Sequence, residues 1–206
     1  MNEIKAIETY YKGYRFRSRL EARWAVFFDA LGIEYRYELE GFKLPDGKYY
    51  LPDFYLPEFN IYVEIKPSRE LDDGKAESFG LGICNFDEGA PGGILICYGD
   101  PLNHDMRFVT ACESNESYYG SYDTDVGIFV RNVRFEINRF EGVIIHISPD
   151  KKWERQFHNA KKIYTDFYYP GSVYYSEAVV KAAEEKARQA RFEHGEKPVM
   201  VGTGTT

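Results

Sequence analysis

Apolar side chains recur at helical spacing in the segment from residue 18 to residue 31. Ser18 and Glu21 form an S-x-x-E capping box at its start, and Gly32 stands where a left-handed C-cap residue belongs. The pattern predicts a helix over 18–31. The residues that would bury one face of this helix are Leu20, Trp24, Phe27, Phe28 and Leu31.

Three strand candidates follow this helix. Residues 33–40 alternate aromatic or apolar side chains with charged ones, as a half-buried strand does. Residues 48–55 form a second candidate, in which Pro52 indicates an edge or a bulge. Residues 60–66 alternate strictly, which predicts a third strand. Its two faces carry Ile61, Val63 and Ile65 on one side and Asn60, Tyr62, Glu64 and Lys66 on the other.

The rest of the chain carries weaker signals. Ser68 precedes a helix predicted over 69–79, and a short apolar run between glycines predicts a buried strand over 93–98. Residues 100–125 have the composition of a long irregular loop or an insertion. The remaining predicted elements are strands over 125–137 and 142–148, a helix over 151–166 and a helix from Ser176 to near His194. This order of elements predicts the α/β (α+β) fold class.

Composition excludes several classes of protein. The chain has 206 residues, 44% hydrophobic and 29% charged, which allows one globular domain with or without an extension. No run of about 18 apolar residues occurs, so no membrane-spanning helix is expected, and the N-terminus lacks a secretory pattern. Cys84, Cys97 and Cys112 have no C-x-x-C spacing. Their spacing argues against a disulfide framework or a cysteine zinc site and favours the cytoplasm.

The net charge of −7 is concentrated in one part of the chain, residues 70–125, which we call the acidic segment. It holds 12 acidic and 2 basic side chains, whereas residues 1–69 hold 11 of each. The overall charge therefore does not exclude a nucleic-acid partner. Candidates to hold phosphates lie in a local basic cluster that comprises Lys12, Arg15, Arg17, Arg19 and Arg23.

Two carboxylates and a lysine fall at corresponding places of neighbouring predicted strands. Asp53 follows Pro52, and Glu64 and Lys66 lie two residues apart on the next strand, so that their side chains share a face. Paired strands lie about 4.8 Å apart, which lets both carboxylates reach one hard cation such as Mg²⁺. Lys66 would orient or deprotonate a water, or offset charge on a phosphorane-like transition state.

These residues match a known motif. The PD-(D/E)XK motif of the restriction-endonuclease-like nuclease superfamily resembles Pro52-Asp53 followed by Glu64-Ile65-Lys66. The segment from Phe16 to Ala25 is similar to the first helix of uncharacterised members from phages and mobile elements. The resemblance covers about residues 11–98. It implies a core made of a helix, antiparallel strands, a second helix and a further strand.

The resemblance implies a metal-dependent deoxyribonuclease. Asp53 and Glu64 would bind Mg²⁺ or Mn²⁺, the backbone carbonyl of Ile65 would add a ligand, and Glu21 would join the site, directly or through water. The implied division of the chain is a nuclease core over 1–100, an acidic loop or insertion over 101–125, a strand and helical extension over 126–195 and a disordered tail over 196–206.

Each of these residues also has a structural interpretation. Glu21 stands where a capping-box glutamate binds the N-cap amide and complements the helix dipole. Asp53 could simply flank a turn. Glu64 and Lys66 could form an ion pair on a solvated strand, worth less than about 1 kcal/mol. The arginines of the basic cluster suit a solvated helix face and entry loop equally well.

Other residues are open to two interpretations. Lys75 falls where some relatives keep an extra basic or polar catalytic residue, but it also suits a solvated helix. His146 lies in an apolar strand and is expected in the core. The tyrosines that could stack on bases, or belong to the core or its rim, are Tyr10, Tyr11, Tyr14 and Tyr35, and those that could form a lid are Tyr118, Tyr119 and Tyr122.

A second class of function stays open. A protein with this fold that binds without cutting could recognise DNA, or a partner protein such as a host defence factor, through the acidic segment. A stretch with a net charge of −10 is an unusual companion for a polyanionic substrate. The sequence also leaves a homodimer open, for which residues 151–195 could supply the interface.

Overall fold

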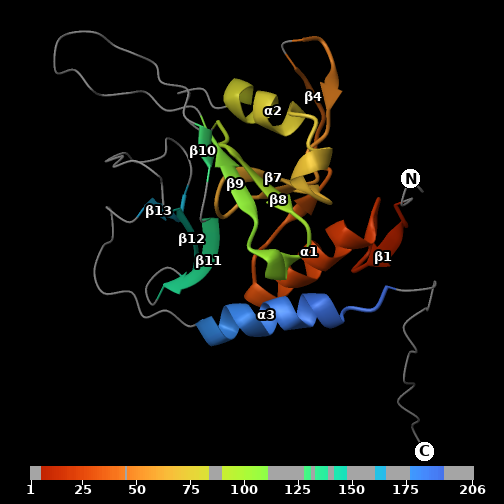
Figure 1. Cartoon of the computed structure of the whole chain (residues 1–206), viewed down its shortest axis with the longest axis vertical. Coiled ribbons are helices and arrows are strands. Elements are labelled where there is room, and N and C mark those ends of the chain that lie inside the picture. Colours follow the sequence, from red (N-terminus) through yellow and green to blue (C-terminus); the bar gives the residue numbers. More distant parts are fainter. Residues whose placement is uncertain are drawn as a thin grey trace, which may run out of the picture.

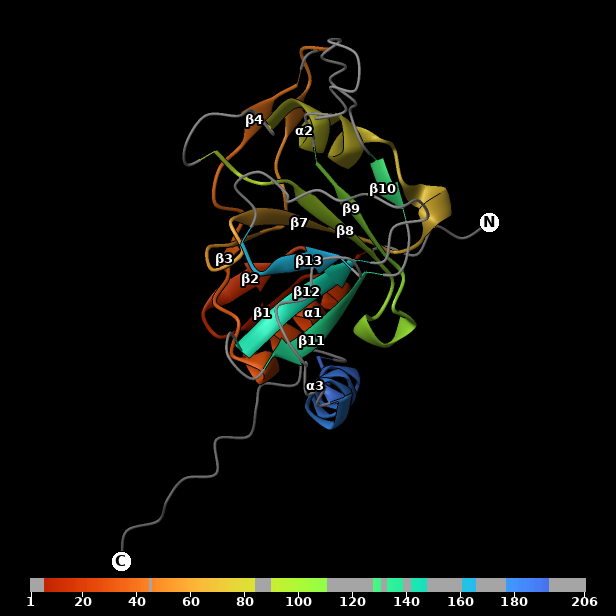
Figure 2. The same ribbon diagram turned by 90° about the vertical axis from the view of Figure 1, so that its left-hand side faces the viewer.

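The structure is a computed structural model. It describes residues 6–44, 46–83, 90–110, 128–130, 133–138, 142–147, 161–165 and 177–192. Within these residues the chain has a mixed α/β architecture, in which helices cover a central sheet and a smaller sheet packs beside it (Figures 1 and 2). None of the helices so described is long and apolar enough to cross a lipid bilayer.

The central sheet has six strands. Its neighbouring strands are antiparallel except β7 and β8, which run parallel and are joined through helix α2 (Lys75–Ile83), as a crossover connection requires. In spatial order the strands are β10 (Ile128–Val130), β9 (Met106–Val109), β8 (Ile94–Tyr98), β7 (Ile61–Lys66), β6 (Phe54–Leu56) and β3 (Arg36–Tyr37).

Helix α1 (Arg19–Leu31) covers one face of this sheet and confirms the helix predicted over 18–31. The Ser18 hydroxyl accepts a hydrogen bond from the Glu21 backbone N–H at 3.1 Å, and Gly32 ends the helix with a φ of 72°. The ring of Phe28 meets that of Phe54 edge to face, with centroids 5.4 Å apart. Each such buried ring stabilises the fold by about 1.5–3 kcal/mol.

The opposite face of the sheet is covered by α2 and by a hairpin of β4 (Phe42–Lys43) and β5 (Tyr49–Tyr50). The Phe79 ring of α2 lies 4.8 Å from the Phe42 ring and 5.0 Å from the Tyr50 ring, centroid to centroid. These contacts fix the hairpin against α2. The buried residues of this second core are Leu44, Tyr50, Tyr62, Ala76, Phe79, Ile94, Ile96, Tyr98 and Val109.

Strand β7 confirms the predicted alternation over residues 61–66, whereas Asn60, with a φ of 53°, lies in the turn before the strand. Ile61, Val63 and Ile65 belong to the core under α1, whereas Tyr62 belongs to the core under α2. Glu64 lies on the α2 side and is 7% exposed. On this face of β7, α2 and the β4–β5 hairpin cover Tyr62 and Glu64, whereas Lys66 keeps part of its side chain exposed.

A second sheet and a third helix pack beside α1. The sheet contains β11 (Val133–Asn138), β12 (Gly142–Ile147) and β13 (Ile163–Thr165), and the helix is α3 (Glu177–Gln189), which lies along α1 (Figure 1). The Phe135 ring of β11 contacts Phe27 of α1 with centroids 5.3 Å apart. His146 of β12 is 1% exposed, which confirms its predicted place in the core.

A second hairpin, formed by β1 (Thr9–Tyr11) and β2 (Tyr14–Phe16), precedes α1. The tyrosines that were predicted either to stack on bases or to belong to the core fall into two groups. Tyr11, Tyr14 and Tyr35 pack against the core under α1, whereas Tyr10 is 71% exposed.

The helix predicted over 69–79 begins later than its pattern indicates. Residues Arg69–Leu71 form the 3₁₀ helix η1, and α2 starts only at Lys75. Gly74 adopts a φ of 73°, and its N–H is held by the Asp72 side chain at 3.0 Å. This turn breaks the helical path because a left-handed residue cannot continue a right-handed helix.

Two predictions in the second half of the chain are wrong where the structure describes it. Residues 100–125 are not wholly irregular, because η2 (Pro101–Asn103) leads into β9 of the central sheet. The helix predicted over 151–166 does not include residues 163–165, which form β13 parallel to β12. Pairing with the preceding strand decides both cases, because β9 pairs with β8 and β13 pairs with β12. Residues 111–127, 151–160 and 193–206, with Tyr118, Tyr119 and Tyr122, lie outside the described residues.

Candidate functional site

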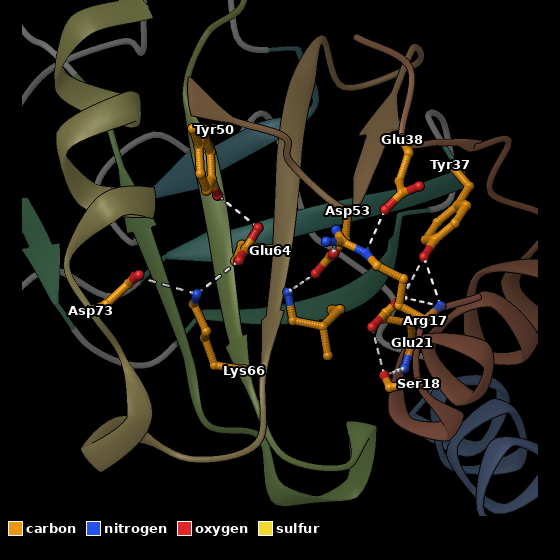
Figure 3. Close-up of polar contacts among 11 residues, drawn as sticks. Arg17, Ser18, Glu21, Tyr37, Glu38, Tyr50, Asp53, Glu64, Lys66 and Asp73 are labelled. Atoms are coloured by element: carbon orange, nitrogen blue, oxygen red, sulfur yellow. Dashed lines mark hydrogen bonds and ion pairs between the residues drawn. The ribbon is translucent and has the colours of Figure 1, made fainter. Parts of the chain in front are cut away.

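Asp53, the residue before β6, and Glu64 of β7 lie at corresponding positions of neighbouring segments. Phe54 of β6 pairs with Val63 of β7, so the next step of this antiparallel register places Asp53 opposite Glu64. Pro52 lies between β5 and β6 and ends the pairing of the small hairpin there. Asp53 thus lies where the chain enters the central sheet, and Figure 3 shows its side chain directed toward Arg17 while that of Glu64 points toward Tyr50 and Lys66.

The Asp53 carboxylate is buried, with 4% of the residue exposed. Its Oδ2 accepts a hydrogen bond from the Ile65 backbone N–H at 2.8 Å, and its Oδ1 lies 3.2 Å from Nη2 of Arg17. Burial raises the pKa of Asp53 well above its ordinary value, and the negative charges of Glu64 and Glu21 raise it further. The Ile65 N–H and Arg17 act in the opposite direction.

Glu64 is held from two sides. Its Oε2 accepts a hydrogen bond from the Tyr50 hydroxyl at 2.7 Å, and its Oε1 lies 2.9 Å from Nζ of Lys66 (Figure 3). Burial is the largest cause of the raised pKa of Tyr50, and the negative charge of Glu64 raises it further. The phenol therefore stays protonated and remains a donor. The orientation of Glu64 is therefore fixed by both neighbours.

Lys66 is a cation at neutral pH. Burial acts to lower its pKa, but Glu64, and then Asp73 at 3.5 Å, raise it above the ordinary value. A protonated lysine has no free electron pair, so it orients groups and offsets negative charge but does not accept a proton. Of the roles predicted for Lys66, the geometry favours orientation and charge compensation over deprotonation of a water.

Glu21 is engaged at the start of α1. Its Oε1 accepts a hydrogen bond from the Ser18 hydroxyl at 2.6 Å, and its Oε2 accepts one from the Tyr37 hydroxyl at 2.5 Å and one from the Arg17 N–H at 3.1 Å. These contacts satisfy the helix start, as the structural interpretation of Glu21 requires. Its charge nevertheless reaches Asp53, whose pKa it raises.

The four arginines predicted to hold phosphates lie in different surroundings. The Arg17 guanidinium bridges Asp53 and Glu38, with Nε 2.5 Å from the Glu38 carboxylate (Figure 3). The other three do not share this arrangement: Arg15 pairs with Glu8, Arg23 lies 3.5 Å from Asp100, and Arg19 is half-buried at the first position of α1. Of the four arginines predicted to hold phosphates, Arg17 is thus the one that lies against the Asp53 carboxylate.

Four residues around the site escaped the sequence analysis, namely Tyr37, Glu38, Tyr50 and Asp73. Tyr50 precedes the Pro-Asp pair by two residues, and this closeness is the signal that could have identified it. Asp73 also pairs with Lys75, whose Nζ lies 2.8 Å from Oδ2, the oxygen that does not contact Lys66. The contacts of Tyr37 and Glu38 depend on the fold and have no local signal.

The donor set suits a hard divalent cation. The residues of Figure 3 include five carboxylates and two cationic side chains, so negative charge is in excess around Asp53. Within the described part of the chain, no three His, Cys, Asp or Glu side chains are gathered closely enough to hold a metal by themselves. Mg²⁺, however, needs only one or two carboxylates, with water and substrate phosphate as its other ligands.

Comparison of the chain with models of known protein families, with curated proteins and with solved structures finds no match. The resemblance to the restriction-endonuclease-like superfamily therefore stays a prediction from the sequence.

Proposed function

We propose that the protein is a metal-dependent nuclease that hydrolyses phosphodiester bonds of DNA. The observation that carries the proposal is the arrangement of Asp53 opposite Glu64 across two paired strands, with the Lys66 ammonium 2.9 Å from Glu64. Both carboxylates are buried, and burying negative charge is costly even where Arg17 and Lys66 offset part of it. A catalytic cation at this point would offset that cost.

The order of elements supports a restriction-endonuclease-like fold. Helix α1 is followed by β3, β6 and β7, which are antiparallel neighbours, then by α2 and by β8, which is parallel to β7. This is the order that the motif resemblance implies. The β4–β5 hairpin is an addition between the first two of these strands.

Asp53 and Glu64 would hold Mg²⁺ or Mn²⁺, the carbonyl of Ile65 would add a ligand, and Glu21 would act on the site through water. When bound, the cation supplies Lewis-acid polarisation of the scissile phosphate and lowers the pKa of water. Lys66 orients the attacking water and offsets charge on the phosphate oxygens. Tyr50 keeps Glu64 in its orientation through a 2.7 Å hydrogen bond.

Charge pairing lessens the objection that an acidic protein is a poor partner for DNA. Half of the acidic side chains in the acidic segment lie in the described part of the chain, and most of these have basic partners. Asp73 contacts Lys66, while Asp105 pairs with Arg69, which lies outside the segment. The remaining pairs are Glu77 with Arg107 and Asp100 with Arg23. The second class of function, a binding protein that docks through this segment, has correspondingly less support.

The test is cleavage of labelled single-stranded, double-stranded and branched DNA with Mg²⁺ or Mn²⁺. Wild type is expected to cleave at least one substrate, and Asp53→Ala and Lys66→Ala are each expected to lose about 100-fold or more in rate. Lys181→Ala is the control, because Lys181 is an exposed lysine of α3 that pairs with Glu177. Equal cleavage by wild type, Asp53→Ala and Lys66→Ala would overturn the proposal.

A further inference from the structure

Two exposed tyrosines lie on the two small hairpins. Tyr10 of β1 is 71% exposed and Tyr49 of β5 is 82% exposed. Among the aromatic side chains whose burial the structure describes, these two are the exposed ones. Single exposed apolar residues are common on protein surfaces, but two tyrosine rings in matching positions call for a common explanation.

Each tyrosine has a cationic residue directly across its hairpin. Tyr10 pairs with Arg15, whose guanidinium lies 6.0 Å from the ring centroid, and Tyr49 pairs with Lys43. If Glu8, which precedes β1 and pairs with Arg15, is counted with the first hairpin, each hairpin has two cations and one carboxylate and so a net charge of +1 in a chain of net charge −7. The charged residues are Glu8, Lys12 and Arg15 on the first and Lys43, Asp46 and Lys48 on the second.

Both hairpins are joined directly to the site. Strand β2 ends at Phe16, and the next residue is Arg17, which contacts Asp53. Strand β5 ends at Tyr50, which donates to Glu64, while its neighbour Tyr49 faces solvent. Along the vertical axis of Figures 1 and 2, β7 lies between β4 and β1 in both views.

We infer that the two hairpins form a binding surface for single-stranded DNA, with unpaired bases stacked on Tyr10 and Tyr49 and the backbone drawn across the carboxylate site. The inference rests on the proposed function and adds the class of substrate. Aromatic rings beside cations bind single strands without reading their sequence, because every base has a stacking face. The bases of a duplex are already stacked on one another, so these rings favour an unpaired strand.

The charge of the hairpins decides between DNA and a protein partner. Protein interfaces are also rich in tyrosine and arginine, but cations directly opposite Tyr10 and Tyr49, in a chain of net charge −7, favour a polyanion over a protein. Phosphates are complementary to these cations and to Arg17. The strand would then reach Asp53 and Glu64 from both sides.

The test is fluorescence anisotropy of the full chain with a fluorescein-labelled oligothymidylate, in a chelator that prevents cleavage and at one fixed salt concentration. Tyr10→Ala and Tyr49→Ala are each expected to bind about tenfold more weakly than wild type. Tyr10→Phe and Tyr49→Phe retain the ring and should bind as wild type does. Val179→Ala removes an exposed apolar side chain of α3 and serves as the control.

Four outcomes separate this inference from the proposed function. Duplex DNA that binds more tightly than the single strand, or alanine variants that bind as wild type does, would overturn the inference while Mg²⁺-dependent cleavage still stood. Absence of any DNA binding by wild type would overturn it too, in favour of a protein surface. Loss of single-strand binding in both alanine variants, without cleavage by wild type, would support the surface and reject the nuclease. Circular dichroism of each variant checks that these exposed positions leave the fold intact.

Discussion

The Nη2 atom of Arg17 lies 3.2 Å from Oδ1 of Asp53. Arg17 thereby places its positive charge beside the carboxylate that we propose as a ligand of a divalent cation. The Arg17 side chain is 55% exposed and its guanidinium also pairs with Glu38, so it has a second partner when it leaves Asp53. Arg17 compensates the charge of Asp53 when no cation is bound, and it is free to meet a phosphate when one is.

Arg17→Gln is expected to destabilise the cation-free protein by about 1 kcal/mol. The value is small because Arg17 is partly exposed, although its partner is buried. Mg²⁺ should then raise the unfolding temperature more in the variant than in wild type, because it replaces a missing charge. Thermal unfolding with and without Mg²⁺ measures both effects. Arg36→Gln, at an exposed arginine of β3, is the control. An equal Mg²⁺ shift in variant and wild type would contradict this role for Arg17.

Tyr50→Phe is expected to lower the free energy of unfolding by about 1–3 kcal/mol, because a buried carboxylate oxygen of Glu64 loses its donor. Cleavage should fall as well, since Glu64 is then held by Lys66 without Tyr50. Urea unfolding and the cleavage rate are the two measurements. Tyr55→Phe removes a similar hydroxyl that donates to Asn60 at 2.8 Å, and it should leave cleavage unchanged. Equal losses of cleavage in both variants would show that Tyr50 has no specific role.

The raised pKa of Asp53 predicts how stability depends on pH. Native Asp53 keeps its proton to higher pH than unfolded Asp53, so the cation-free protein loses stability as pH rises from the ordinary carboxyl value through the raised one. Asp53→Asn should remove that part of the loss, which urea unfolding at a series of pH values detects. The same dependence in wild type and Asp53→Asn would refute the assignment.

Asp73 contributes in a different range of pH. Burial acts to raise its pKa, but Lys75 and Lys66 lower it to about 2. Its contribution is therefore present above the ordinary carboxyl value and lost as pH falls through about 2. Asp73 loses its contribution at lower pH than Asp53 does. One series of urea unfolding curves at different pH values therefore distinguishes the two residues.

The sequence was sufficient to predict those elements that short-range interactions determine. Ser18, Glu21 and Gly32 define α1 by short-range caps, and strict alternation defines β7. The placement of Asp53 opposite Glu64 follows from one short turn between two strands, because a tight connection leaves little freedom of register. The pairing of these two carboxylates was therefore predictable from spacing alone.

The sequence was insufficient where contacts join distant segments. Strands β9 and β13 are four and three residues long and form only because a partner strand is already in place. The contact of Tyr50 with Glu64 depends on packing of the β4–β5 hairpin against Phe79 of α2. Arg17 was predicted to meet a phosphate, but its contact with Asp53 depends on how β2 enters α1, which no local pattern specifies.

The most direct test of the account is the crystal structure of the full chain soaked with Mn²⁺, with the metal located by its anomalous scattering. The account predicts an anomalous peak between the carboxylates of Asp53 and Glu64, about 2.0–2.2 Å from an oxygen of each, with Arg17 displaced from Asp53. Asp53→Asn crystals treated in the same way should lack the peak. If wild-type crystals show no peak at that position and Arg17 remains in contact with Asp53, the central claim is contradicted.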